Sequence, residues 1–356
     1  MNKFVPEKKY AYKTEDSGKV YFFAIIALLA LNFIFSFIAD ALASNSTLDK
    51  AEAVKGIYNS PLFNSLFALC SLLVLLGVYF LHKKIENFSY SACAITKKVK
   101  WHTVLICILV GVVSLLGLQY LTGAFDDFLG LIKFPLDSSS VFDLSNAGNY
   151  ILATIVLCLI PAIGEELIFR GVVLHGLQSR FTSWGAISLS SAMFALFHMN
   201  LQQVFYQFLL GMIMAWVVLK TGSLISSMIV HFTSNFLVVT MEFIRVQTGF
   251  SLNIAHTWWF YLLAVILAGI TFAVLFVIDK FYFNKLNAQS ENIDKNDKTF
   301  DNNSNNVLNN ESASKAPSLN LSAGQKEARA SGYLYLALSI GVILLIVSTV
   351  SSYLAG

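Results

Sequence analysis

Long apolar runs recur along this chain and limit what it can fold into. Each is close to the roughly 20 residues that an α-helix needs to cross the hydrocarbon core of a bilayer. Of the 356 residues, 56% are hydrophobic and only 13% are charged, whereas soluble domains are about 25% charged. The chain therefore predicts an all-α, polytopic transmembrane helical bundle, with about eight spans plus one C-terminal span after a disordered linker. The apolar runs cover residues 20–43, 61–82, 102–125, 149–169, 184–200, 202–219, 223–244, 257–279 and 332–354.

Composition divides the chain into four parts. Residues 1–19 form a polar N-terminal tail, and residues 20–283 hold the membrane helical domain. Residues 284–331 are rich in Asn, Lys, Asp and Ser and offer few side chains for a core, so we expect a disordered cytoplasmic linker there. Residues 332–356 form the last transmembrane helix, which we expect to be an anchor added to the main bundle. The fifth apolar run is short, and a tilted or incomplete crossing is an alternative for it.

The placement of Lys and Arg indicates a cytoplasmic N-terminus, because basic residues in short loops mark the inner side of a membrane. With alternating spans, most basic residues then fall inside. The outer side receives Lys50, Lys55, Lys133 and Arg245. We expect a multi-pass protein of the cell membrane, in contact with the lipid bilayer and not with nucleic acid. The oligomeric state stays open, and His82, beside a basic loop, is expected to be solvated.

Polar and ionisable side chains interrupt three of the apolar runs. They are Glu165 and Glu166 near the end of the fourth run with Arg170 directly after it, His198 in the fifth, and His231 with Asn235 in the seventh. A charge at the centre of a membrane helix costs about 2.5–3.5 kcal/mol on insertion scales, and such residues normally face the bundle interior and serve function. We therefore expect these side chains to converge on one site.

Helical spacing predicts different roles for the two adjacent carboxylates. Glu166 and Arg170 are four residues apart and share a helix face, so they are expected to form an ion pair. Glu165 is rotated by about 100° from Glu166. It is then the carboxylate that remains free for chemistry.

A carboxylate, two imidazoles and an amide suit hydrolysis of a peptide bond. The carboxylate takes a proton from water, with an imidazole holding the water or passing on the proton. A second imidazole and the amide N–H stabilise the oxyanion. Alternatively, Glu165, His198 and His231 are the ligands of a zinc ion that activates the water. The sequence leaves the cofactor unknown, because it does not separate the two mechanisms.

The three motifs together resemble the type II CAAX prenyl protease family, also called the CPBP or Abi family. They are Glu165-Glu166-x-x-x-Arg170, Phe194-x-x-x-His198 and His231-x-x-x-Asn235, which occur in this order between residues 149 and 244. The resemblance implies an intramembrane endopeptidase, acting as a metalloprotease or as a metal-independent glutamate protease. Eukaryotic members trim prenylated CAAX tails, and bacterial members are linked to bacteriocin processing and immunity.

The same resemblance implies roles for the individual residues. Glu165, with His198, would activate the water, while His231 and Asn235 would form the oxyanion site. The remaining motif residues would support the site or position the substrate. They are Glu166, Arg170 and Phe194.

We therefore expect an intramembrane peptidase that cleaves a membrane-associated or lipidated peptide or protein. The alternative is a non-enzymatic immunity or scaffold protein that keeps the family fold. A proton-coupled transporter is a third class, but the chain shows no internal repeat of the kind that transporters carry. The motifs of other intramembrane hydrolases, such as H-E-x-x-H, are missing.

Overall fold

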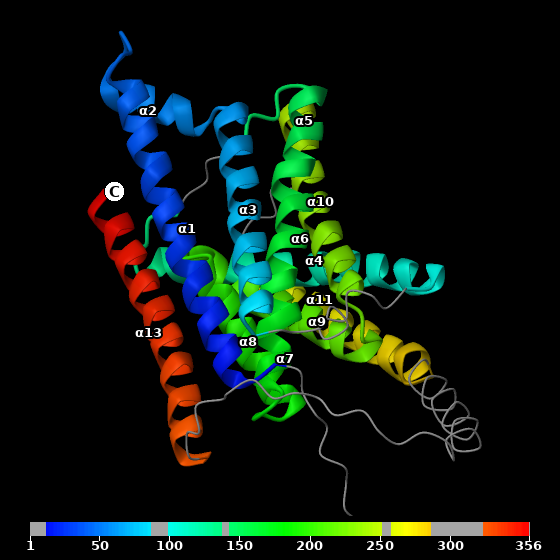
Figure 1. Ribbon diagram of the computed structural model, residues 1–356. Helices are drawn as coiled ribbons and strands as arrows, with labels where there is room; N and C mark the ends of the chain where they lie inside the picture. Colours follow the sequence, from blue (N-terminus) through cyan, green and yellow to red (C-terminus); the bar gives the residue numbers. More distant parts are fainter. Residues whose placement is uncertain (1–11, 87–98, 137–141, 251–257, 286–322, 356) are drawn as a thin grey trace, which may run out of the picture.

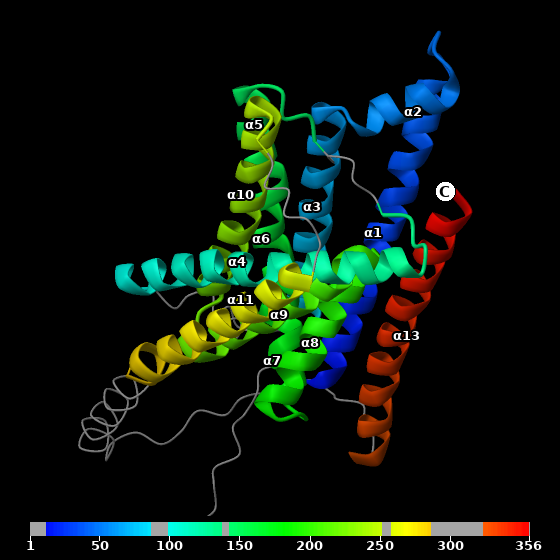
Figure 2. The same ribbon diagram turned by 180° about the vertical axis from the view of Figure 1, so that it is seen from behind.

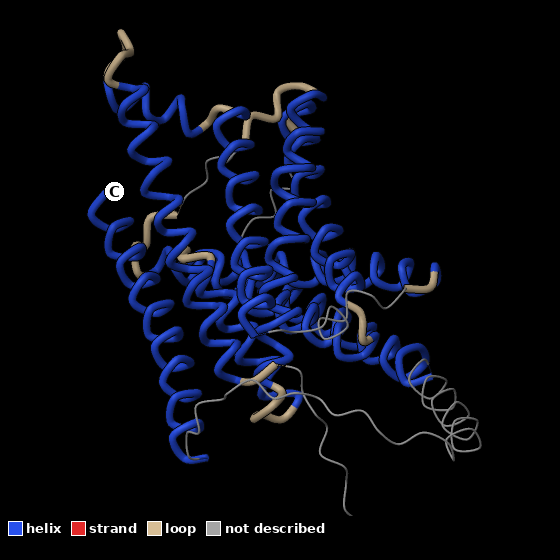
Figure 3. The backbone as a smooth tube through the Cα atoms, in the orientation of Figure 1, coloured by secondary structure: helices blue, strands red, loops and turns tan. Residues whose placement is uncertain are grey.

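A computed structural model describes residues 12–86, 99–136, 142–250, 258–285 and 323–355, and in these ranges the chain is helical without strands (Figures 1 and 3). Eight helical stretches among them are long and apolar enough to cross a membrane. This confirms the predicted polytopic helical bundle. The stretches are Thr14–Ala43 (α1), Pro61–Glu86 (α3), Trp101–Leu131 (α4), Ala147–Leu177, Leu201–Thr221 (α9), Leu224–Thr248 (α10), Trp258–Phe283, and Gly332–Ser351 within α13 (Ala323–Ala355).

The fifth apolar run forms α8, a helix of 15 residues from Ser183 to Phe197 that does not count among these eight. At 1.5 Å per residue it is about 22 Å long, shorter than the bilayer core of about 30 Å. The alternative of an incomplete crossing therefore fits this run, and the direction of the later spans stays a prediction. The expected linker at 284–331 falls mostly on 286–322, outside the described residues, while α13 begins at Ala323, before residue 332 where we expected it.

The helix that carries the two glutamates is irregular. It consists of α5 (Ala147–Ala153), η2 (Thr154–Leu159), α6 (Ile160–Glu166), η3 (Leu167–Val173) and α7 (Leu174–Leu177), and η2 and η3 are π-helical. Pro161 lies in α6 and has no N–H to donate. Single π turns inside α-helices are frequent at functional sites. Glu165 and Glu166 thus sit between two segments in which the regular helical hydrogen bonding changes.

The helices pack in two directions. In Figure 1, α1, α3, α13 and the α5–α7 stretch run side by side, and α4 lies crosswise behind them. Figure 2 shows α4 from behind, with α11 (Trp258–Ile278) packed against it and α10 crossing it. The short helix α8 and the longer α9 form an antiparallel hairpin in the middle of the bundle. The site residues of α6, α8 and α10 therefore meet at the centre of the molecule, where the two sets of helices cross.

The end of the bundle near Thr14 brings α1 together with α3 and with the η3–α7 stretch. The hydroxyl of Ser17 donates to the carbonyl of Val173 at 2.9 Å. His82 at the end of α3 is buried, with Nε2 3.3 Å from Oδ1 of Asp16 on α1. Our expectation of a solvated His82 was wrong, because helix packing places its ring between α3 and the first turn of α1.

The C-terminal helix α13 is part of the bundle. A Cβ atom at Gly18 of α1 would lie 2.7 Å from the backbone carbon of Tyr333 on α13. At Gly341 of α13, a Cβ atom would lie 2.7 Å from the hydroxyl of Tyr21 and 3.2 Å from Cβ of Leu196 on α8. Small residues of this kind let membrane helices approach closely. The helix that we expected to be an added anchor therefore packs against α1 and α8.

This close approach makes Gly18 sensitive to size. We expect Gly18→Leu to lower stability by about 1–3 kcal/mol, because overpacking forces α1 and α13 apart. The measurement is the thermal unfolding midpoint of the purified protein in detergent. The matched control is Gly77→Leu on α3, where a Cβ atom meets nothing within 4 Å. Equal midpoints for the two variants would mean that α13 does not pack in this way.

Candidate active site

A buried ion pair forms the base of the site. Oε1 of Glu166 lies 2.7 Å from Nη1 of Arg170, and the two side chains are 0% and 1% exposed. Nη2 of Arg170 donates to the carbonyl of Gly211 on α9 at 3.3 Å. The pair predicted from the four-residue spacing is thus confirmed, and it connects η3 to α9.

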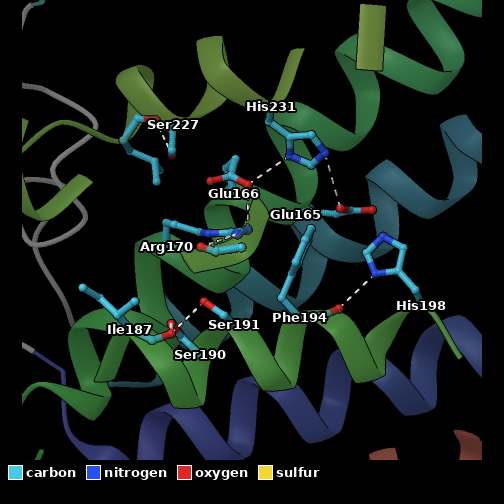
Figure 4. A network of polar contacts seen from close by, with 12 residues as sticks. Glu165, Glu166, Arg170, Ile187, Ser190, Ser191, Phe194, His198, Ser227 and His231 are labelled. Atoms are coloured by element: carbon cyan, nitrogen blue, oxygen red, sulfur yellow. Dashed lines mark hydrogen bonds and ion pairs between the residues drawn. The ribbon is translucent and has the colours of Figure 1, made fainter. Parts of the chain in front are cut away.

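His231 on α10 is held by the same carboxylate. Its Nδ1 lies 3.0 Å from Oε1 of Glu166. Because Glu166 pairs with Arg170, its carboxylate accepts, and Nδ1 of His231 is the donor. This contact fixes the tautomer and turns Nε2 of the ring toward Glu165, whose Oε2 lies 3.9 Å away (Figure 4).

Glu165 has no comparable anchor. Its side chain is 16% exposed, and among the described residues its Oε2 has no hydrogen-bond partner although it is buried. The distance of 3.9 Å to His231 is too long for a direct hydrogen bond. The fold therefore leaves Oε2 of Glu165 without a hydrogen bond, which agrees with the assignment of Glu165 as the free carboxylate.

His198 approaches from the end of α8. Its Nδ1 lies 2.9 Å from the carbonyl oxygen of Phe194. A carbonyl only accepts, so Nδ1 carries the hydrogen, and in the neutral ring Nε2 has the free lone pair. Figure 4 shows the carboxylate of Glu165 between the rings of His231 and His198.

Phe194 lies between these polar groups and is fully buried. Its ring centroid is 4.2 Å from Cζ of Arg170 and 4.8 Å from the ring of His198. It also meets the ring of His231 edge-on, at 6.0 Å. The aromatic residue of the second motif thus separates the ion pair from His198 and restricts the position of both histidines.

Asn235 occupies a different place from the other motif residues. Its Nδ2 donates to the carbonyl of Leu157 at 3.1 Å. In a regular α-helix this carbonyl would accept from the N–H of residue 161, but residue 161 is a proline. The amide of Asn235 therefore satisfies a backbone group beside Pro161, and its role at an oxyanion stays a prediction.

The geometry of the two histidines fits one requirement of the alternative with a bound zinc ion. Both histidines donate from Nδ1 to an oxygen, the arrangement that commonly leaves Nε2 for a metal. However, no group of three His, Cys, Asp or Glu side chains in the described part of the chain lies close enough together to hold a metal ion. The metal roles of Glu165, His198 and His231 stay a prediction, and no step proposed below requires them.

The sequence did not reveal the backbone groups of the site. The carbonyls of Gly211 and Leu157 are hydrogen-bond acceptors for Arg170 and Asn235. Pro161, four residues after Leu157, was an available signal, because proline removes the donor for that carbonyl. For Gly211 the sequence signal was weaker, namely a small residue in an apolar helix. In the structure a Cβ atom at this position would lie 3.1 Å from Cβ of Ser191.

Comparison with known families gives a match over the part of the chain that carries the three motifs. The family described as "Type II CAAX prenyl endopeptidase Rce1-like" matches residues 147–237. The chain carries an Rce1-like domain. This confirms the resemblance seen in the three motifs, all of which lie inside the matched region, and it supports a CAAX protease-type membrane endopeptidase. No curated protein and no solved structure gives a significant match to the chain.

Proposed function

We propose that this protein is an integral membrane endopeptidase that hydrolyses a peptide bond through the Rce1-like domain. The observation that carries the proposal is the position of Glu165 between two histidine rings, where its buried Oε2 makes no hydrogen bond to any of the described residues. Burial of an unpaired carboxylate oxygen is unfavourable. Its retention at the centre of a membrane domain favours a chemical role over a structural one.

In the proposed reaction, Glu165 acts as general base and takes a proton from a water molecule. The lone pair on Nε2 of His198 accepts a hydrogen bond from the same water, which fixes its direction. The water oxygen forms a bond to the carbonyl carbon of the substrate, and the carbonyl oxygen becomes an oxyanion. When the tetrahedral intermediate breaks down, the C–N bond breaks and the proton held by Glu165 passes to the leaving amine.

His231 stabilises the oxyanion in this scheme. Its Nδ1–H already donates to Glu166, so only Nε2 is left to face the reacting group. To donate from Nε2 the ring must carry both protons, and the carboxylate of Glu166 then balances its positive charge. Glu166 and Arg170 are therefore positioning residues that act through His231.

We propose a membrane-associated or lipidated peptide or protein as the substrate. The site residues lie on helices of a multi-pass membrane domain, and a lipid chain concentrates a peptide at the bilayer. We also propose a location in the cell membrane with a cytoplasmic N-terminus. Lys19 of α1 and Glu86 of α3 form an ion pair at 3.5 Å, which places the start of α1 on the same side as the basic end of α3.

Hydrolysis in labelled water tests the proposed function. The purified protein in lipid nanodiscs should cleave a farnesylated CAAX-type peptide. It should cleave the same peptide without its lipid about tenfold more slowly. In H₂¹⁸O, mass spectrometry should find one ¹⁸O atom in the new carboxylate after a single turnover. Cleavage that persists in a chelator supports the glutamate mechanism, and cleavage that stops supports the metal alternative. If none of a panel of lipidated and unlipidated peptides is cleaved, the non-enzymatic alternative is favoured.

A further inference from the structure

Helix α9 places the polar side chain of Gln207 in line with its buried residues. The buried stripe of this helix includes Leu210, Gly211, Met214 and Val218, which recur at the spacing of a single helical face. Gln207 belongs to the same stripe, because it precedes Gly211 by four residues and Leu210 by three. The face that contains Gln207 therefore points into the bundle.

The contacts of Gly211 indicate which part of α8 lies next to Gln207. The carbonyl of Gly211 accepts from Arg170, and a Cβ at Gly211 would touch Ser191 of α8. Because α8 and α9 are antiparallel neighbours, one turn back along α9 corresponds to one turn forward along α8. This register puts Gln207 at the level of Phe194 and Ala195 along α8, and Phe194 contacts Arg170 and His198 of the site.

The carboxamide oxygen of Gln207 has no structural use in the part of the chain that the structure describes. Its Oε1 is buried and makes no hydrogen bond there. A buried polar atom left without a partner costs about 1–3 kcal/mol. Proteins accept such a cost mainly at sites where function requires it.

We propose that Gln207 binds the main chain of the substrate peptide next to the bond that is cleaved. Its Oε1 accepts a peptide N–H, and its Nε2 donates to a peptide carbonyl. A peptide that enters a site within the bilayer loses the water that satisfies its backbone groups, so those groups need partners from the protein. A carboxamide supplies both kinds of partner and does so without regard to the side chains of the substrate. This inference rests on the proposed function.

The variant Gln207→Met tests the proposal, because Met keeps the length of the side chain and removes its hydrogen bonds. We expect KM for the cleaved peptide to rise about tenfold and kcat to stay within twofold of wild type. The reason is that these hydrogen bonds to the peptide are equally strong in the ground state and in the transition state, so their loss weakens binding without slowing the chemical step. The thermal unfolding midpoint should stay level or rise, because the buried unpaired amide is gone.

The matched control is Gln247→Met on α10. Nε2 of Gln247 donates to the carbonyls of Leu144 and Ser145 at 3.0 and 2.9 Å. We expect this variant to lose stability and to keep KM within twofold. A Gln207→Met protein with wild-type KM, or one that fails to fold, would overturn the inference.

A binding measurement separates this inference from the proposed function. The Kd of a photo-crosslinkable lipidated peptide is compared in the Glu165→Gln protein with and without Gln207→Met. A tenfold weaker Kd in the double variant supports the role of Gln207 even if the wild-type protein cleaves nothing. An unchanged Kd overturns it even if wild-type cleavage is strong.

Discussion

Replacing Glu165 with Gln should abolish peptide cleavage and leave the protein folded. Gln has the same shape but cannot take a proton from water, so we expect kcat/KM to fall by about 10³-fold, within the usual range for loss of a general base. Oε2 of Glu165 makes no hydrogen bond within the described part of the chain. The thermal unfolding midpoint should therefore stay close to that of wild type, and both quantities are measured on the same preparation.

The control for this prediction is Glu242→Gln. Glu242 is on α10, the helix of His231, but pairs with Arg245 at the end of that helix, with the side chains 29% and 52% exposed. The Glu242→Gln protein should cleave the peptide at the wild-type rate. We expect His231→Ala to abolish cleavage as well. Wild-type-like proteolysis by both Glu165→Gln and His231→Ala would remove the site assignment, and a biological effect that survives Glu165→Gln would favour a binding protein over an enzyme.

Loss of Arg170 should have the largest effect on stability. Arg170→Met leaves the carboxylate of Glu166 at 0% exposure without its cation, and breaking a buried ion pair in this way costs about 3–5 kcal/mol. We expect poor recovery of folded protein and a strongly lowered unfolding midpoint. Activity should also fall, because Glu166 no longer holds His231 in place.

A second substitution should reverse part of this loss. In the Glu166→Gln/Arg170→Met protein no buried charge is left unpaired, so its unfolding midpoint should lie above that of Arg170→Met. Arg245→Met breaks an exposed pair instead and should cost no more than about 1 kcal/mol. If Arg170→Met is as stable as Arg245→Met, or if the double variant is no more stable than Arg170→Met, the ion pair is not the anchor of the site.

The sequence by itself determined the features that lie within one helix. Apolar length predicted the membrane spans, and it left the short run at α8 as the ambiguous one, which the structure shows as a helix of 15 residues. The four-residue spacing predicted the ion pair of Glu166 with Arg170, found at 2.7 Å. These predictions succeed because helix geometry fixes which residues share a face, whatever packs against them.

Only the tertiary structure decided the contacts between helices. The sequence did not show that Glu166 holds Nδ1 of His231, that Asn235 donates to the carbonyl of Leu157, or that Oε1 of Gln207 is buried without a partner among the described residues. Each depends on how a helix is rotated and where it crosses its neighbour. Those quantities come from the packing of the whole bundle, including the close contact of α13 with α1 at Gly18, and no local spacing encodes them.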